Sequence, residues 1–331
     1  MPDPPAASPA NAMARYPELA DLPVLERPDA MFGKLFGALA APRMLEGLLP
    51  IALEWRPDLV VADAAEFAGP IVAADLGVPC VSRGFGPLLP ETRVARAGAE
   101  VASLWRSRGL EPRPYGGMYD HLYLDIFPPS LQASPAGHIA RRQSLRPIAY
   151  DGDVEGEVPL PGLRPDWPLV YVTMGTVFND PGPLCNAVDA VASLDARVLV
   201  TVGPAADPSV VGTQPEHVRV ERYLPQTRVL AACAVVVSHA GSGTVLATLA
   251  AGVPQLCLPQ GADQFLNARA VADAGAGISL LPDAATPEAI RGALDGLLEE
   301  RSYRGCAVTV SADIAAMPSP ADVSAVLEAL S

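Results

Sequence analysis

Positive charge is scarce in this sequence. Of the 331 residues, 23 are basic and 37 are acidic, so the formal net charge at pH 7 is −14. Lys34 is the only lysine. A nucleic-acid-binding protein needs a basic face that neutralises phosphates, so we expect no nucleic-acid partner.

Long hydrophobic runs are also missing. The apolar run Val229–Val237 is far shorter than the roughly 20 residues that a membrane-spanning helix needs. Residues 1–20 lack the basic segment and the following apolar segment of a secretory signal peptide. These absences predict a cytoplasmic protein without a membrane span.

Cysteines at metal-binding or disulfide-like spacing do not occur. The sequence has five cysteines, an odd number, and no CxxC pair. This pattern argues against a disulfide framework and a zinc site, and it favours small buried side chains. The five are Cys80, Cys185, Cys233, Cys257 and Cys306.

The residues that are present indicate a two-domain α/β protein. Half of them are hydrophobic, and at about 150 residues per domain the length predicts two domains. In the second half, short apolar runs alternate with segments of helical spacing, which predicts a parallel, doubly wound sheet. The expected strands are Leu169–Met174, Arg197–Val202, Val218–Tyr223, Ala234–Ser238 and Gln255–Leu258.

The first half shows fewer strands than such a sheet requires. Leu59–Ala62 and Val78–Val81 have the pattern of buried strands, and helical spacing over 31–55 is interrupted at Pro42 and Pro50. A sheet of two strands would leave both edges open. Either strands escape detection here or the chain lacks the start of its first domain, and we favour the second explanation. The expected domains are 1–147 and 167–331, joined by a Pro- and Gly-rich linker at 148–166.

A strand that runs into a glycine-rich loop is the strongest candidate site. The segment Ser238–Thr244 reads Ser-His-Ala-Gly-Ser-Gly-Thr and leads into a helix. The first N–H groups of a helix have no internal partner, so they attract anions such as phosphate. Gly241 and Gly243 allow close approach, while His239 lies at the strand end. A tight strand-to-helix turn without a ligand would explain this segment alone equally well.

Two further polar segments follow strands of the same sheet. Gly175-Thr176 ends one strand, and Asp263-Gln264 follows another. A carboxylate and an amide together can bind adjacent hydroxyls of a sugar. Because open α/β sheets bind ligands at the carboxyl ends of their strands, the three segments favour a binding site over a simple turn.

These motifs together resemble a known family. Residues 221–281 closely resemble the donor-binding region of nucleotide-sugar-dependent glycosyltransferases of the GT-B fold, and 57–221 do so more weakly. The likeness is greatest to the actinobacterial branch that modifies macrolides and other natural products. It implies two Rossmann-like α/β domains, the first incomplete here: an acceptor-binding domain at 1–147 and a donor-binding domain at 167–331.

The resemblance also implies a role for each motif residue. Tyr223 would stack on the nucleobase, and Gln226 would help to hold the nucleoside. Asp263 and Gln264 would bind hydroxyls of the donor sugar. The residues that would contact the diphosphate are His239, Gly241, Ser242, Gly243 and Thr244, with Gly175 and Thr176 contributing from the first strand of the domain.

The sequence departs from the family pattern in two places. Many relatives carry a glutamate that holds both ribose hydroxyls, and this chain has Ala247 there. The change favours a dTDP-sugar, although other groups could hold the ribose of a UDP-sugar. The family's general base is a histidine near the N-terminus, but residues 1–60 contain none, whereas Asp63 matches the carboxylate that orients it. These features predict that the chain is N-terminally truncated.

Other candidate groups are weaker. His121, within an aromatic segment, could replace the missing base, but a structural histidine is the favoured interpretation. His138 lies in a Pro- and Gly-rich stretch at 133–166, and His217 in a loop. Asp151-Gly152-Asp153 spells the metal-binding DxD motif of another glycosyltransferase class, but its Pro- and Gly-rich surroundings favour a solvated turn.

The expected function is inverting, metal-independent hexosyl transfer from a dTDP- or UDP-sugar to a hydroxyl of a small apolar acceptor. No cofactor is expected, and a homodimer is possible. One alternative is a nucleotide-sugar-binding protein that has lost catalysis, which the missing base favours. The other is an epimerase or hydrolase of the nucleotide sugar, which needs a second carboxylate beside Asp263.

Overall fold

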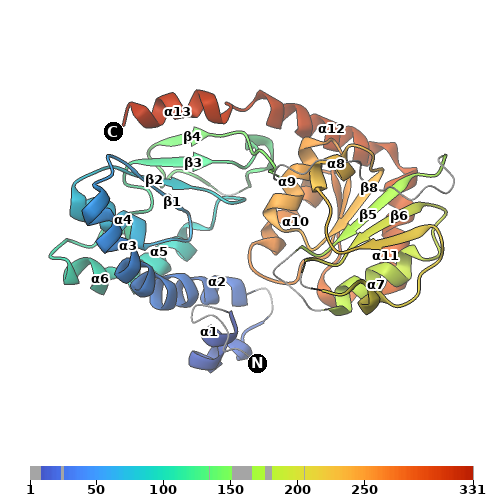
Figure 1. The fold of residues 1–331 in the computed structure, drawn as a ribbon, viewed down its shortest axis with the longest axis horizontal. Coiled ribbons are helices and arrows are strands. Elements are labelled where there is room, and N and C mark those ends of the chain that lie inside the picture. Colours follow the sequence, from blue (N-terminus) through green and yellow to red (C-terminus); the bar gives the residue numbers. More distant parts are fainter. Residues whose placement is uncertain are drawn as a thin grey trace. The chain divides into compact units, whose positions relative to one another are not determined.

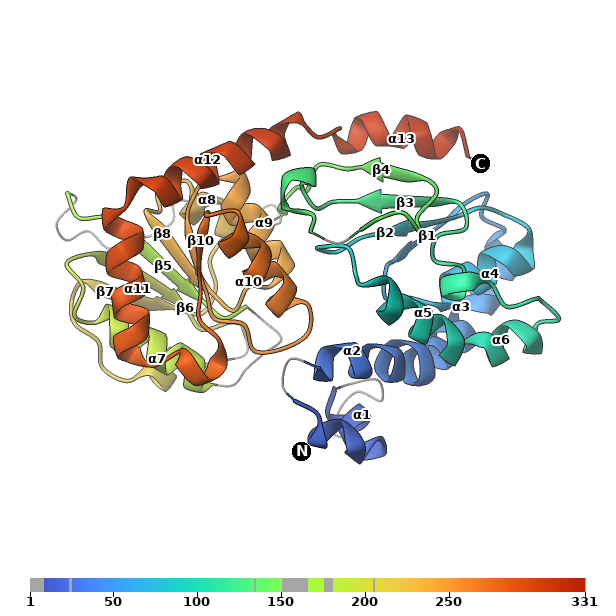
Figure 2. The same cartoon turned by 180° about the vertical axis from the view of Figure 1, so that it is seen from behind.

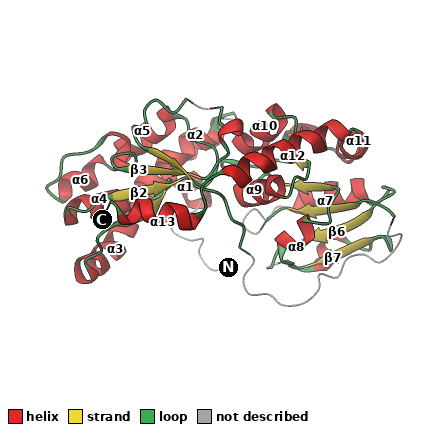
Figure 3. Ribbon diagram, turned by 90° about the horizontal axis from the view of Figure 1, so that it is seen from above, coloured by secondary structure: helices red, strands yellow, loops and turns green. Residues whose placement is uncertain are grey.

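The computed structural model describes residues 9–23, 26–133, 135–150, 166–175, 181–204 and 206–330. The chain divides into two compact units, each built on its own parallel sheet (Figures 1 and 3). The first unit comprises Met1–Phe127, Gln132–Arg146 and Met317–Ser331, and the second comprises Pro128–Leu131 and Pro147–Ala316.

The sheet of the first unit has four parallel strands in the order β1-β2-β3-β4. The strands are β1 (Val60–Asp63), β2 (Cys80–Arg83), β3 (Leu122–Asp125) and β4 (Arg142–Ser144). The helices of this unit are α1 (Pro9–Arg15), α2 (Arg27–Phe32), α3 (Ala41–Trp55), α4 (Ala68–Leu76), α5 (Glu91–Glu100), α6 (Ala102–Ser107) and α13 (Pro320–Glu328).

The expectation of only two strands in this half was wrong. β3 has the sequence Leu-Tyr-Leu-Asp, and all four residues are buried, but its aromatic and charged neighbours hide it in the sequence. β4 is the polar tripeptide Arg-Gln-Ser and has no apolar run. Strands did therefore escape detection, because neither segment carries the continuous β-branched run that marks a buried parallel strand.

Residues 27–55 form one helical stretch in which the prolines cause no break. Pro42 lies near the start of α3 and Pro50 lies further along it, and the helix continues through both although each removes one backbone N–H. The eight residues Gly33–Ala40 before α3 adopt a π-helix. By length and composition alone, this stretch is apolar enough to cross a membrane, a test that core helices of soluble proteins also pass.

The C-terminal helix α13 packs on the sheet of the first unit (Figure 2). Val323 is buried against Val81, Leu122 and Leu124. Arg146, which follows β4, donates its backbone N–H to the carbonyl of Pro318 at 2.8 Å. The sequence analysis assigns 317–331 to the second domain, but these contacts place the segment in the first unit.

The second unit has a six-stranded parallel sheet in the order β10-β9-β8-β5-β6-β7, which confirms the predicted α/β architecture. Its strands are β5 (Leu169–Thr173), β6 (Arg197–Thr201), β7 (Val218–Glu221), β8 (Val235–Ser238), β9 (Gln255–Cys257) and β10 (Gly277–Ser279). Its helices are α7 (Pro181–Val191), α8 (Gln226–Leu230), α9 (Ser242–Ala250), α10 (Gln264–Asp273), α11 (Pro287–Glu299) and α12 (Arg301–Ala316).

The connection order creates a switch point between β5 and β8. From β5 the chain adds β6 and β7 on one side, then returns to add β8, β9 and β10 on the other. Helices α7 and α11 supply apolar residues to the core on one face of the sheet, and α8 and α9 supply them on the other. Ligands of open α/β sheets bind at such switch points, so the loops after β5 and β8 are well placed for a site.

Candidate functional site

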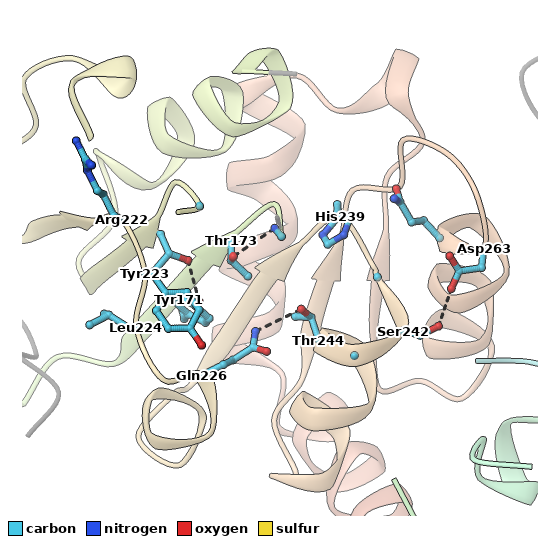
Figure 4. Close-up of a pocket in the computed structure, with 16 residues that line it drawn as sticks. Tyr171, Thr173, Arg222, Tyr223, Leu224, Gln226, His239, Ser242, Thr244 and Asp263 are labelled. Atoms are coloured by element: carbon cyan, nitrogen blue, oxygen red, sulfur yellow. Dashed lines mark hydrogen bonds between the residues drawn. The ribbon is translucent and has the colours of Figure 1, made fainter. Parts of the chain in front are cut away.

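A pocket of about 390 Å³ opens at the carboxyl ends of β5, β6 and β8, a volume typical of small-molecule sites (Figure 4). All predicted donor-site residues that the structure describes line it, and Thr176 lies outside the described residues. The lining residues are Gly175, Tyr223, Gln226, His239, Gly241, Ser242, Gly243, Thr244, Asp263 and Gln264, together with Tyr171, Thr173, Thr201, Gly203, Arg222 and Leu224.

The imidazole of His239 lies between two glycines. A Cβ atom on Gly175 would come within 2.5 Å of Cε1 of His239, and one on Gly241 would come within 2.6 Å of Nε2. Gly175 also has a φ of +74°, a conformation that favours glycine. Both glycines are therefore required so that the ring can occupy its position.

The turn after His239 contains a non-glycine residue in the left-handed region. Ala240 has a φ of +62° and is fully buried. Its N–H donates to Oγ of Ser238 at 3.1 Å, and its carbonyl accepts from Nδ2 of Asn267 at 2.9 Å. A left-handed alanine costs roughly 1–2 kcal/mol, so these two side chains stabilise a strained turn that directs the chain from β8 into α9.

The start of α9 offers unpaired donors to the pocket. No side chain caps this helix, whose N-cap is Gly241, and the first N–H groups of a helix have no internal acceptor. A Cβ on Gly243 would meet no atom within 4 Å, so open space lies beside the backbone there. Nε2 of Gln226 donates to Oγ1 of Thr244 at 3.3 Å, which ties α8 to this turn. The arrangement suits an anion.

Asp263, immediately before α10, receives hydrogen bonds on one carboxylate oxygen. Oγ of Ser242 donates to its Oδ2 at 2.6 Å, and Nδ2 of Asn267 donates to the same atom at 2.8 Å. Gln264 is buried, and its Oε1 accepts from the N–H groups of Gln260 and Gly261 at 2.8 and 3.1 Å. Its carbonyl oxygen therefore holds the preceding loop, and its amide nitrogen is the group left for a ligand.

Burial lowers the pKa of His239, and the negative charge of Asp263 partly opposes this effect. The pocket without a ligand therefore favours a neutral imidazole at neutral pH. An anion bound at the start of α9 would add a second negative charge near the ring and favour its protonation.

Buried hydroxyls form another wall of the pocket. The hydroxyls of Tyr171 and Thr201 share a hydrogen bond of 2.8 Å, and Oγ1 of Thr173 accepts from the N–H of Gly175 at 3.4 Å. Tyr223 is 51% exposed, which leaves its ring available for stacking. Sequence analysis did not single out the hydroxyl residues, because a threonine or tyrosine inside a strand is an ordinary strand residue.

Asn267 is the most informative residue that sequence analysis missed. It is fully buried and bonds to Ala240, Ser242 and Asp263. Its spacing of four residues from Asp263 places both side chains on one face of a helix, and this was the available signal.

In the first unit, Asp63 and His121 do not come together in one site. Asp63 ends β1 and pairs with Arg83 at 2.9 Å, with both side chains well exposed. His121 lies just before the amino end of β3, whereas Asp63 lies at the carboxyl end of β1, and Nδ1 of His121 accepts from the N–H of Cys80 at 3.2 Å. The favoured structural interpretation of His121 is therefore confirmed. Asp151-Gly152-Asp153, for which a solvated turn is expected, lies outside the described residues.

Ala247 faces apolar neighbours and does not line the pocket. It is 8% exposed and packs in a cluster with Tyr171, Val229 and Leu230. It lies one helical turn after Thr244, so a longer side chain at this position would extend along the face that leads to the pocket.

Sequence profiles of one family match both halves of the chain. The "Erythromycin biosynthesis protein CIII-like, N-terminal domain" matches residues 30–153, and the corresponding C-terminal domain matches 186–330. These matches cover well over half of the chain.

Individual relatives agree with this assignment. Elloramycin glycosyltransferase ElmGT of Streptomyces olivaceus is 38% identical over 296 residues, which are 87% of this chain and 72% of the relative. TDP-daunosamine transferase DnrS of Streptomyces peucetius is 32% identical over 95% of this chain and 78% of its own. Spinosyn rhamnosyltransferase SpnG has a similar structure, with a TM-score of 0.81 and 28% identity over 97% of this chain and 84% of its own. The chain belongs to the erythromycin biosynthesis protein CIII-like family of natural-product glycosyltransferases with the GT-B fold.

Proposed function

We propose that this chain transfers a hexosyl group from a dTDP-sugar to a hydroxyl of a polyketide-like natural product. The observation that carries the proposal is one pocket that contains a buried histidine, an uncapped helix start and a carboxylate. SpnG structures have been solved with thymidine diphosphate and with spinosyn aglycone, and they share 29% and 28% identity with this chain at a TM-score of 0.79.

Each part of the pocket suits one part of such a donor. The N–H groups at the start of α9 and the ring of His239 would bind the diphosphate, whose leaving charge they stabilise. Asp263 keeps Oδ1 outside its bonds to Ser242 and Asn267, and this oxygen would accept from a sugar hydroxyl. Tyr223 would stack on the base, and Gln226 would contact the nucleoside.

The pocket favours transfer over epimerisation or hydrolysis of the nucleotide sugar. When those reactions are catalysed by an acid and a base that are both carboxylates, two such groups must lie near the sugar. Among the described residues that line the pocket, Asp263 is the only carboxylate. The diphosphate charge would be met by helix N–H groups and His239 without a metal.

Replacement of His239 by alanine tests the donor site. A charge-assisted hydrogen bond to diphosphate contributes roughly 1.5–3 kcal/mol, so His239→Ala should weaken TDP binding about 10- to 150-fold. Because burial lowers the pKa of His239 and a bound diphosphate would raise it, TDP binding should take up a proton. Wild-type affinity should therefore rise as the pH falls from 8 to 6.5.

Calorimetric titration of TDP over this pH range measures both effects. His239→Ala serves as the control for protonation of TDP itself, so the slope of affinity against pH should be steeper for the wild type. Equal affinities of wild type and variant, or equal slopes, would remove His239 from the diphosphate site.

Ala247 provides a test of the dTDP preference. The wild type should bind dTDP at least as tightly as UDP, because it has no carboxylate at this position to hold a ribose 2′-hydroxyl. Ala247→Glu should shift the ratio towards UDP by about tenfold, the effect of one charge-assisted hydrogen bond. Ala247→Gln is the matched control, since it has the same length without the charge. A wild type that binds UDP tenfold more tightly than dTDP would contradict the preference.

A further inference from the structure

One amide group connects three parts of the donor pocket. Nδ2 of Asn267 lies 2.9 Å from the carbonyl of Ala240, 3.0 Å from Oγ of Ser242 and 2.8 Å from Oδ2 of Asp263. These partners belong to the turn after β8, the first residue of α9 and the residue before α10. Asn267 is fully buried, so water does not compete for these bonds.

The direction of these bonds fixes the orientation of Asp263. Both Asn267 and Ser242 donate to Oδ2, and Ser242 does so at 2.6 Å. Two donors on one oxygen hold the carboxylate plane and leave Oδ1 to accept from another group. The same amide supports the left-handed turn at Ala240, which directly follows His239.

We propose that Asn267 is a positioning residue, which aligns Asp263 with the donor sugar. This inference rests on the proposed function, because it assumes that Asp263 contacts the sugar. It also explains why an amide is needed. An aspartate at position 267 would place a second carboxylate next to Asp263, where two like charges cannot both ionise without strong repulsion.

Asn267→Asp gives a pH signature that a purely structural residue would not show. At pH 8 the two carboxylates repel each other, so the affinity for dTDP-glucose should fall at least tenfold, while the affinity for TDP should change less than threefold. At pH 6 the pair can share one proton, and the donor bond to Asp263 is restored, so most of the loss should disappear. His239 is the titratable group that interacts with Asp263, and TDP itself takes up a proton in this range, so each affinity of the variant is compared with that of the wild type for the same ligand at the same pH.

The double variant Asp263→Asn with Asn267→Asp separates the effect of Asn267 on sugar binding from its effect on the stability of the fold. It restores an amide–carboxylate pair with exchanged partners, so its melting temperature should exceed that of Asn267→Asp at pH 8. Its affinity for dTDP-glucose should match that of Asp263→Asn alone within twofold, because Asn267 acts through Asp263.

The proposal is tested by calorimetric titration of TDP and dTDP-glucose at pH 6 and 8. The four proteins are the wild type, Asn267→Asp, Asp263→Asn and the double variant. Three results would exclude a positioning role for Asn267 while leaving the donor site intact. The first is that Asn267→Asp lowers the affinities for TDP and dTDP-glucose equally, and the second is that it lowers the affinity for dTDP-glucose equally at both pH values. The third is that the double variant binds dTDP-glucose more weakly than Asp263→Asn alone. If the wild type binds neither TDP nor dTDP-glucose, the proposed function and the positioning role both fail.

Discussion

Gly175→Ala is expected to abolish most donor binding, with a loss of TDP affinity of about 100-fold or more. The new Cβ would lie 2.5 Å from Cε1 and 2.8 Å from Nε2 of His239, so the ring would have to leave its position. The variant should also unfold more easily by about 2–4 kcal/mol, since a left-handed alanine and a steric clash both cost energy. Titration with TDP and chemical denaturation measure the two effects.

Gly243→Ala is the matched control within the same pocket. Its Cβ would meet no protein atom within 4 Å, so the stability should remain within about 0.5 kcal/mol of the wild type. If Gly175→Ala binds TDP as the wild type does, then the close packing of His239 between glycines is not required for the site.

Val323→Asp is expected to destabilise the first unit while donor binding survives. Val323 is 2% exposed and contacts apolar residues of β2 and β3, so the substitution buries a charge without a partner. Such a change costs about 3–5 kcal/mol. The pocket residues all belong to the second unit, so TDP affinity should change less than twofold.

Hydrogen exchange resolved by segment measures this effect, since a chain with two units need not unfold in one step. Protection should fall in β2, β3 and β4 and persist in β5 and β8. Ala325→Asp is the control, because this residue lies on the exposed side of α13. Equal loss of protection in the strands of both units, or an equal effect of the control, would contradict the assignment of α13 to the first unit.

Much of the donor pocket could be predicted because its signals are local. The strand, glycine loop and helix around His239 are contiguous in sequence, and the carboxyl ends of parallel strands meet at one edge. The close packing of the His239 ring could not be predicted, because it depends on Gly175, which is 64 residues away in the sequence. The role of Asn267 could not be predicted either. It depends on three acceptors from different segments, and only the folded structure brings these together.

The strands of the first unit were harder to predict from the sequence, for a different physical reason. β3 and β4 are held by neighbouring strands and by α13, β3 is only four residues long, and the residues of β4 carry weak strand preference. Tertiary context therefore decides their structure. Asp63 was located correctly at a strand end, but its ion pair with Arg83 involves the neighbouring strand, and spacing alone gives no indication of it.

The return of α13 to the first sheet sets an order for folding on the ribosome. Domains generally fold as the chain emerges, with the N-terminal one first. Here the ribosome makes all of Pro147–Ala316 before it makes Val323, so the apolar residues of β2 and β3 stay uncovered throughout that time. The second unit can therefore reach its native state first, while the sheet of the first unit still lacks the helix that covers it.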